Sequence, residues 1–112
     1  MRGLPELQLI ARHDALRRSL APTLARLVGR EVALGSGAGE ALPGTVIVAT
    51  TDAVTAADCE RLVAEGHDVV MLAAFPTPDE ETSYRRAGVR EYLPMVIDTL
   101  PLAAALMALA WR

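Results

Sequence analysis

The chain has 112 residues, of which 52% are hydrophobic and 22% are charged, and its formal net charge is −3. This composition excludes a disordered chain, and the negative charge argues against direct contact with nucleic acid, whose binding domains usually carry a basic face. The length predicts one domain, residues 1–112. The single Cys59 permits no internal disulfide, and the lack of a leader or a long apolar run predicts a cytoplasmic protein without membrane contact.

The first part of the chain predicts two strands and one helix. An apolar run at residues 7–11 has the length of a strand, and Asp14 follows it as the predicted N-cap of a helix. Leucines at helical spacing continue this helix to a stop at Gly29. Pro22 predicts a kink or a break, because proline lacks a backbone N–H and crowds the carbonyl four residues earlier. Residues 31–34 are a weak strand candidate, and residues 35–39 predict a loop.

The second part alternates strands and helices. Residues 45–50 and 68–74 are continuous apolar runs, which indicate strands buried on both faces. Residues 56–65 predict a short amphipathic helix that ends at Gly66 and carries Cys59 in the core. A polar helix at residues 79–87 ends at Gly88, a strand follows at residues 90–94, and an apolar helix is predicted at residues 100–111.

This alternation predicts an α/β fold. We expect a flavodoxin-like, doubly wound, five-stranded parallel sheet in the order 2-1-3-4-5. Only ten residues separate Leu34 from Thr45, and four of them are glycines. Because a parallel crossover normally needs a dozen residues or more, the second helix is predicted to be short or absent.

Residues 86–98, with the sequence RAGVREYLPMVID, resemble a stretch of response-regulator receiver domains that reads roughly A-G-A-x-[DE]-Y-L-x-K-P-x-D. In this match Gly88 ends the fourth helix and Tyr92 takes the place of the switch aromatic. Met95 takes the place of a lysine, and the whole chain contains no lysine, since all 11 basic residues are arginine. The resemblance implies a domain of two-component signal transduction.

The same resemblance implies that the phosphorylation pocket is degenerate. The family uses an acidic pair for magnesium, a carboxylate nucleophile, a hydroxyl, a lysine and a proline. The matching positions here are Arg12 with His13, then Thr50, Ala73, Met95 and Val96. A positive charge at Arg12 repels a divalent cation, and the Thr50 hydroxyl cannot form an acyl phosphate. We therefore expect no phosphorylation, no metal, no cofactor and no enzymatic activity.

A shifted register leaves an alternative open. Asp14 and Asp52 lie close to the positions of the missing carboxylates and could rebuild an aspartyl site. The simpler interpretation is that Asp14 caps a helix and Asp52 lies in a turn. His13 is expected to be an exposed loop histidine, and His67 is expected to be structural or solvated.

The predicted final helix is apolar on all sides from Leu100 to Trp111. One stripe can pack on the sheet, which leaves Leu100, Met107 and Trp111 to face a partner. In receiver domains the fourth helix, fifth strand and fifth helix form the usual dimer or partner surface, which here includes Tyr92. An alternative is that alanines dominate the outer face and the apolar patch is small.

These observations favour a phosphorylation-independent, receiver-like regulatory module that acts through protein contacts. It would form a homodimer or control an output domain such as a transcription factor. A second hypothesis is a small-ligand-binding module of the same fold. In that case an anionic metabolite would dock near Arg12, His13, Thr50, Thr51 and Asp52 at the carboxyl ends of the strands.

Overall fold

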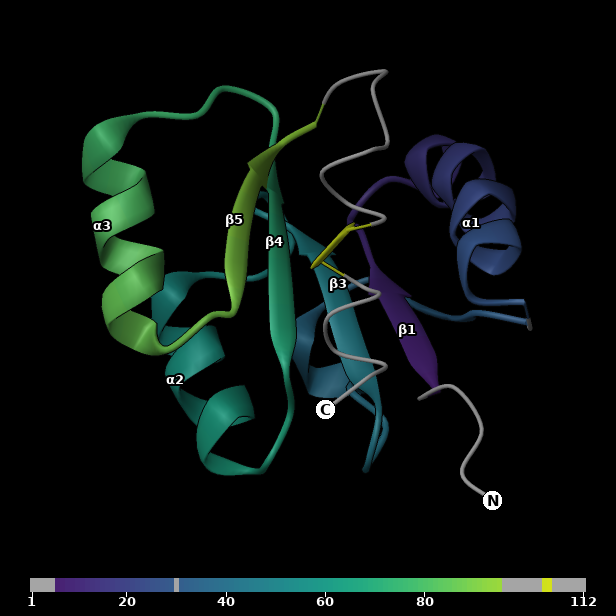
Figure 1. Cartoon of the computed structure of the whole chain (residues 1–112), viewed down its shortest axis with the longest axis horizontal. Coiled ribbons are helices and arrows are strands. Elements are labelled where there is room, and N and C mark those ends of the chain that lie inside the picture. Colours follow the sequence, from purple (N-terminus) through teal and green to yellow (C-terminus); the bar gives the residue numbers. More distant parts are fainter. Residues whose placement is uncertain (1–5, 30, 96–103, 106–112) are drawn as a thin grey trace.

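The computed structural model describes residues 6–29, 31–95 and 104–105 (Figure 1). Five parallel strands form one sheet in the order β2-β1-β3-β4-β5. The predicted flavodoxin-like topology is therefore confirmed. The strands are β1 (Leu7–Ile10), β2 (Ala33–Gly35), β3 (Val46–Thr50), β4 (Val69–Ala73) and β5 (Glu91–Pro94).

Helices cover both faces of the sheet. The described helices are α1 (Asp14–Val28), α2 (Ala56–Ala64) and α3 (Pro78–Ala87), and α1 lies on the opposite side from α2 and α3 (Figure 1). Alternate residues of β3 point to the two faces. Val48 belongs to the core cluster that includes Leu24 of α1, whereas Ile47 belongs to the cluster that includes Leu62 of α2. Every residue of β3 and β4 is buried, as the continuous apolar runs predicted.

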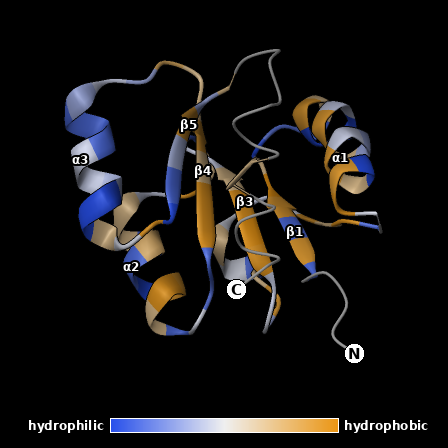
Figure 2. Cartoon of the chain, viewed as in Figure 1, coloured by the Kyte–Doolittle hydropathy of each residue, from blue (hydrophilic) through white to orange (hydrophobic). Residues whose placement is uncertain are grey.

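Hydropathy separates the layers. Figure 2 shows β3 and β4 as hydrophobic strands and α3 as a largely hydrophilic helix. The few inward-facing residues of α3 include Tyr84 and Ala87, which are buried. The exposed face of α3 therefore lies in water or against a polar partner surface.

The crossover from β2 to β3 contains no α-helix. A single 3₁₀ turn, η1 (Ala38–Glu40), takes its place, which confirms the prediction of a short or absent second helix. The side chain of Gln8 lies beneath this crossover and is 1% exposed. Its Nε2 donates to the Glu40 carbonyl at 2.8 Å, and the Leu42 N–H donates to its Oε1 at 2.8 Å. Because the helix is missing, α3 is the fourth helix of the sequence-based count.

Of the kink or break predicted at Pro22, the break does not occur. α1 runs from Asp14 to Val28 with Pro22 inside it. Pro22 is exposed, and so is Arg18, whose carbonyl loses its helical hydrogen bond. Since that carbonyl lies on the water side of the helix, solvent can replace the missing donor.

The prediction that Asp14 is the N-cap was also wrong. The helix begins at Asp14 itself, and the N-cap is His13, whose side chain makes no capping hydrogen bond. The carboxylate of Asp14 instead pairs with Arg18 at 2.7 Å and with Arg17 at 3.6 Å. A negative charge in the first turn still suits the positive end of the helix dipole.

The other helix ends follow their sequence signals. Thr55 and Asp58 form a capping box at the start of α2. Thr77 caps α3, accepting a hydrogen bond from the Glu80 N–H at 3.1 Å. Gly29 and Gly88 end α1 and α3 with φ values of 73° and 99°, which L-residues rarely adopt.

Of the predicted final helix, only Ala104 and Ala105 lie within the described residues, and both are helical. In the part of the chain that the structure describes, no helix is long and apolar enough to cross a membrane.

Candidate functional site

The carboxyl ends of the strands meet at one edge of the sheet. Ile10 pairs with Ala49, and Thr50 pairs with Leu72, so β1, β3 and β4 end side by side. Ala73 pairs with Pro94, and the Met95 N–H continues this ladder by donating to the Ala73 carbonyl at 2.8 Å. The predicted pocket positions on β1, β3, β4 and β5 therefore occur along the same edge.

Thr50 stands at the end of β3 and is 1% exposed. Its hydroxyl lies 2.5 Å from Oδ1 of Asp52, so it donates a hydrogen bond to this carboxylate. A turn brings Asp52 back over the strand end, because the N–H groups of Ala53 and Val54 both donate to the Thr50 carbonyl at 3.0 and 3.1 Å. Asp52 lies in a turn, as predicted.

His13 completes a small group of side chains at this edge. Its Nε2 lies 3.5 Å from Oδ2 of Asp52. The side chains are 70% and 42% exposed, so this contact is worth less than about 1 kcal/mol even when the histidine is charged. We call Thr50, Asp52 and His13 the edge cluster. The expectation of an exposed His13 is confirmed, but its contact with Asp52 was not foreseen.

Asp14 does not join the edge cluster through any described contact. Its ion pairs are with Arg17 and Arg18 of its own helix. Asp52 makes its contacts with Thr50 and His13 instead. Among residues 6–29, 31–95 and 104–105 there is no group of three or more His, Cys, Asp and Glu side chains that could hold a metal ion. The described contacts thus give no support to an aspartyl site shared by Asp14 and Asp52.

Arg17 is a residue of this edge that sequence reasoning missed. Its Nη1 donates to the Ala11 carbonyl at 2.5 Å and to the Arg12 carbonyl at 3.2 Å. Its side chain is only 18% exposed. A guanidinium therefore binds the backbone at the end of β1, where a magnesium-binding site would need carboxylates. No sequence signal distinguishes Arg17, since it is one of several arginines in an amphipathic helix.

The remaining pocket positions are apolar. Ala73 is fully buried and carries no hydroxyl, and Met95 packs against the core on the α1 side of the sheet. Val96 lies outside the described residues.

Cys59 is fully buried, with its Sγ 3.6 Å from the Met71 sulfur, and burial raises the pKa of its thiol to about 12. The predicted core role of Cys59 is confirmed.

Two stacked tyrosines link the edge to α3 and β5. Tyr84 and Tyr92 have ring centroids 5.9 Å apart and an interplanar angle of 27°. The Tyr84 hydroxyl donates to the Val54 carbonyl at 2.6 Å, and the Tyr92 hydroxyl donates to a carboxylate oxygen of Glu80. Burial raises the pKa of both phenols. Tyr84 was also missed, although a lone aromatic residue in a polar helix could have drawn attention to it.

Of the four predicted interface residues, the structure describes only Tyr92. Tyr92 is 6% exposed, so its ring faces the core and offers little surface to a partner. Leu100, Met107 and Trp111 lie outside the described residues. Phe75, in the loop between β4 and α3, is 86% exposed and was not singled out from the sequence.

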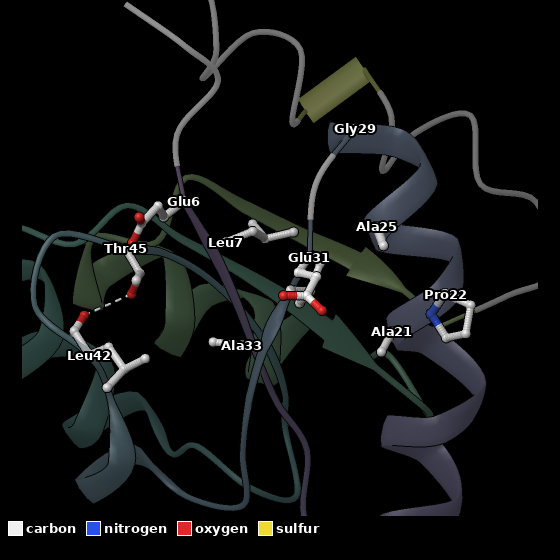
Figure 3. Close-up of a pocket in the computed structure, with 11 residues that line it drawn as sticks. Glu6, Leu7, Ala21, Pro22, Ala25, Gly29, Glu31, Ala33, Leu42 and Thr45 are labelled. Carbon is white, nitrogen blue, oxygen red and sulfur yellow. Dashed lines mark hydrogen bonds between the residues drawn. The ribbon is translucent and has the colours of Figure 1, made fainter.

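A hollow of about 910 Å³ lies at the opposite, amino-terminal end of the strands (Figure 3). It is bordered by Glu6 and Thr45 at the starts of β1 and β3, and by Pro22 and Ala25 of α1. Among the described lining residues, Glu6 and Glu31 carry carboxylates and none carries a basic side chain. His67 also lies near this end of the sheet. Its Nδ1 is 2.8 Å from the Thr45 carbonyl, which gives it a structural role. None of the described residues that line the hollow is a predicted site residue.

No protein-family model and no curated protein sequence match the chain. Solved structures match it along nearly its whole length. A LuxR-family two-component response regulator from Aurantimonas sp. SI85-9A1 has a TM-score of 0.84 at 18% identity, covering 98% of this chain and 88% of that one. A two-component response regulator from Clostridium difficile has a TM-score of 0.81 at 14% identity, covering 96% of each chain.

The receiver domain of NtrC4, solved in solution as a beryllofluoride-activated dimer, has a TM-score of 0.75 at 12% identity. It covers 95% of this chain, which covers 96% of that domain. The fold of the chain is therefore that of response-regulator receiver domains.

Proposed function

We propose that this chain is a receiver-like signalling module that works without aspartyl phosphorylation and acts through protein contacts. The observation that carries the proposal is the burial and hydrogen bonding of Thr50. This residue ends β3, is buried, and donates its hydroxyl hydrogen bond to Asp52. A threonine at this position offers no carboxylate. By resemblance to receiver domains, a carboxylate would be needed here to accept a phosphoryl group.

The electrostatics of the edge support the same proposal. Phosphoryl transfer to a carboxylate needs a divalent cation to neutralise the transferring oxygens. Arg17 binds the backbone at the end of β1, and the exposed Arg12 follows directly. Two guanidinium groups at this point disfavour a divalent cation. Ala73 and Met95 supply neither the hydroxyl nor the ammonium group that would contact a bound phosphoryl group.

We propose the face of α3 and β5, with the predicted helix at residues 100–111, as the partner surface. The exposed side of α3 carries Arg85, which pairs with Glu81 at 3.3 Å and with Glu91 of β5 at 3.7 Å. These pairs place charged side chains of α3 and β5 side by side on one exposed surface. The NtrC4 receiver domain, a neighbour in fold, was solved as a dimer. A homodimer or a protein output partner is the occupant we propose.

Exposure to a phosphoryl donor tests this function. The protein is mixed with magnesium and acetyl phosphate, or with magnesium and beryllofluoride, and its amide NMR spectrum and intact mass are recorded. We expect no shift of the amides of Thr51, Asp52 and Ala53, and no mass increase of one phosphoryl group. An Asp52→Asn variant is the matched control. A phosphoryl adduct that this variant loses would replace the proposal with an active site at Asp52.

A second candidate function rests on Arg12. This residue is exposed, and its guanidinium makes no ion pair with a described residue. Together with His13 it could bind a small anion at the carboxyl ends of the strands, where ligands of doubly wound folds bind. Thermal unfolding with inorganic phosphate and with nucleotides tests this idea. A rise in Tm that Arg12→Ala abolishes would favour the ligand-binding function, and no rise with any anion would remove it.

A further inference from the structure

The hollow beside α1 and β2 is a groove with apolar walls. On the α1 side its lining includes Ala21, Pro22 and Ala25, whose side chains are short. On the other side it is lined by Leu42, which is 46% exposed. Figure 3 shows these two walls on opposite sides of the chain that carries Glu31. With a volume of about 910 Å³, the groove has the size of a ligand-binding site.

The groove carries negative charge. Glu6 lies directly before β1 and Glu31 lies shortly before β2, and both are exposed. Neither carboxylate forms an ion pair with a described residue. The described lining residues include no basic side chain. A cationic group in the groove would therefore meet two carboxylates without displacing a described partner, so the charge of the groove is complementary to a basic ligand.

The strand beside the groove is open on one side. β2 is an end strand of the described sheet, with β1 as its neighbour. Backbone groups on the open side of such a strand are available to hydrogen-bond with an extended segment of another protein. Leu34 of β2 is 50% exposed, which adds apolar surface to this edge. Apolar walls beside an open strand fit a protein segment better than they fit a small cation.

We propose that this groove binds a basic, partly apolar segment of a partner protein. The segment lies extended along β2, with arginine or lysine side chains near Glu6 and Glu31 and apolar side chains against the wall formed by α1. Because successive side chains of an extended chain point to opposite sides, one segment can present both kinds.

The groove is separate from the site described above. It lies at the amino ends of the strands, whereas the edge cluster lies at their carboxyl ends, and none of its described lining residues belongs to α3 or β5. The inference therefore goes beyond the proposed function and does not depend on it.

A model peptide tests the proposal. The probe is a six-residue peptide of alternating arginine and leucine with blocked ends, titrated into the isotope-labelled protein and followed by amide NMR. We expect the amides of Leu7, Val32 and Leu42 to shift and to saturate. A matched peptide with glutamate in place of arginine should cause no shift. No shift with the arginine peptide, or equal shifts with both peptides, would overturn the proposal.

Charge substitutions show whether the carboxylates of the groove matter. Glu31→Gln removes one of them, and the Kd of the arginine peptide should rise about tenfold. Glu60→Gln is the matched control, because Glu60 is exposed on α2 and makes no ion pair with a described residue. Its Kd should stay close to the wild-type value. Equal Kd values for the two variants would mean general attraction between opposite charges and would overturn the proposal.

A substitution that keeps the charge shows whether the groove itself is used. Ala25→Phe places a large side chain on the α1 wall and narrows the groove. Peptide concentrations that saturate the wild-type chain should then give no saturation. Unchanged binding to Ala25→Phe would place the peptide elsewhere and overturn the proposal.

Two measurements without peptide complete the test. Glu31→Gln should leave Tm unchanged, because Glu31 pairs with no described residue; a clear fall would reveal an internal partner and overturn the proposal. Mass in solution identifies the occupant: a wild-type dimer that Glu31→Gln dissociates would make it a second copy of this chain and also overturn the proposal. No phosphoryl donor is used, so these results are independent of the test of phosphorylation.

Discussion

The hydroxyl oxygen of Thr50 and Oδ1 of Asp52 lie 2.5 Å apart at the carboxyl end of β3. The hydroxyl is buried, whereas the carboxylate is partly exposed and also contacts His13 at 3.5 Å. The Thr50 hydroxyl thus donates a hydrogen bond to the turn that follows β3.

Restoring a carboxylate at this position should destabilise the fold. In Thr50→Asp a second carboxylate would stand beside Asp52, and two close carboxylates raise the pKa of one of them. We expect unfolding to become easier by about 1–3 kcal/mol near neutral pH, and by less near pH 4, where one carboxyl is protonated. Urea unfolding at both pH values measures the difference.

Thr50→Asn is the control for this variant, because it has similar size without the charge and should show little dependence on pH. Thr50→Asp is also expected to remain inert toward magnesium and beryllofluoride, since Arg12, Ala73 and Met95 are unchanged. Activation of Thr50→Asp by beryllofluoride would contradict this expectation.

Gln8→Leu should be among the more damaging single substitutions. The change leaves the Leu42 N–H and the Glu40 carbonyl without their side-chain partners beneath the crossover. We expect a loss of about 2–4 kcal/mol in the free energy of unfolding, measured by urea titration. Thr45→Val removes one hydrogen bond to the Leu42 carbonyl in the same crossover and should cost only about 1 kcal/mol. Equal losses for the two variants would show that Gln8 does not hold the crossover.

Gly88 and Gly29 allow a matched test of backbone strain and crowding. Both have positive φ, but a Cβ at Gly88 would lie 3.2 Å from Cγ1 of Val63, whereas at Gly29 nothing lies within 4 Å. Gly29→Ala should cost about 1 kcal/mol from its backbone conformation alone, and Gly88→Ala about 2–3 kcal/mol. Adding Val63→Ala should recover the crowding part of the Gly88→Ala loss. Failure to recover it would place the whole cost in the backbone.

The tyrosine pair predicts weakening of the fold at high pH. Burial is the main cause that raises the pKa of Tyr92 to about 12, with the hydrogen bond to Glu80 second, and burial raises the pKa of Tyr84 further. Above about pH 10 the unfolded chain loses these protons while the folded chain keeps them, so stability falls as pH rises.

Urea midpoints from about pH 8 to about pH 11 check this dependence. In Tyr84→Phe the decline should be shallower than in the wild type, because one raised phenol is removed. Tyr92→Phe is the comparison variant for the second phenol. A wild-type midpoint that stays constant over this range would contradict the prediction.

The sequence by itself determined the order and type of the elements. Continuous apolar runs marked β3 and β4, Gly29 and Gly88 marked helix ends, and ten residues after Leu34 left no room for a second helix. These features are local: chain length, hydrophobic pattern and the permissive backbone of glycine decide them. The same local reasoning allowed a break at Pro22, and α1 does not break there, because the tolerance of a proline depends on which side of the helix faces water.

Only the tertiary structure decided which side chains meet. Gln8 lies 32 residues from Glu40 and Tyr84 lies 30 residues from Val54, yet each pair is hydrogen-bonded. The contact between His13 and Asp52 likewise depends on β1 and β3 being neighbours in the sheet. A sequence pattern predicts whether a residue is buried, but it does not predict the partner of its side chain. A hydrogen bond needs two groups within about 3 Å, and only the packing of distant segments brings these groups together.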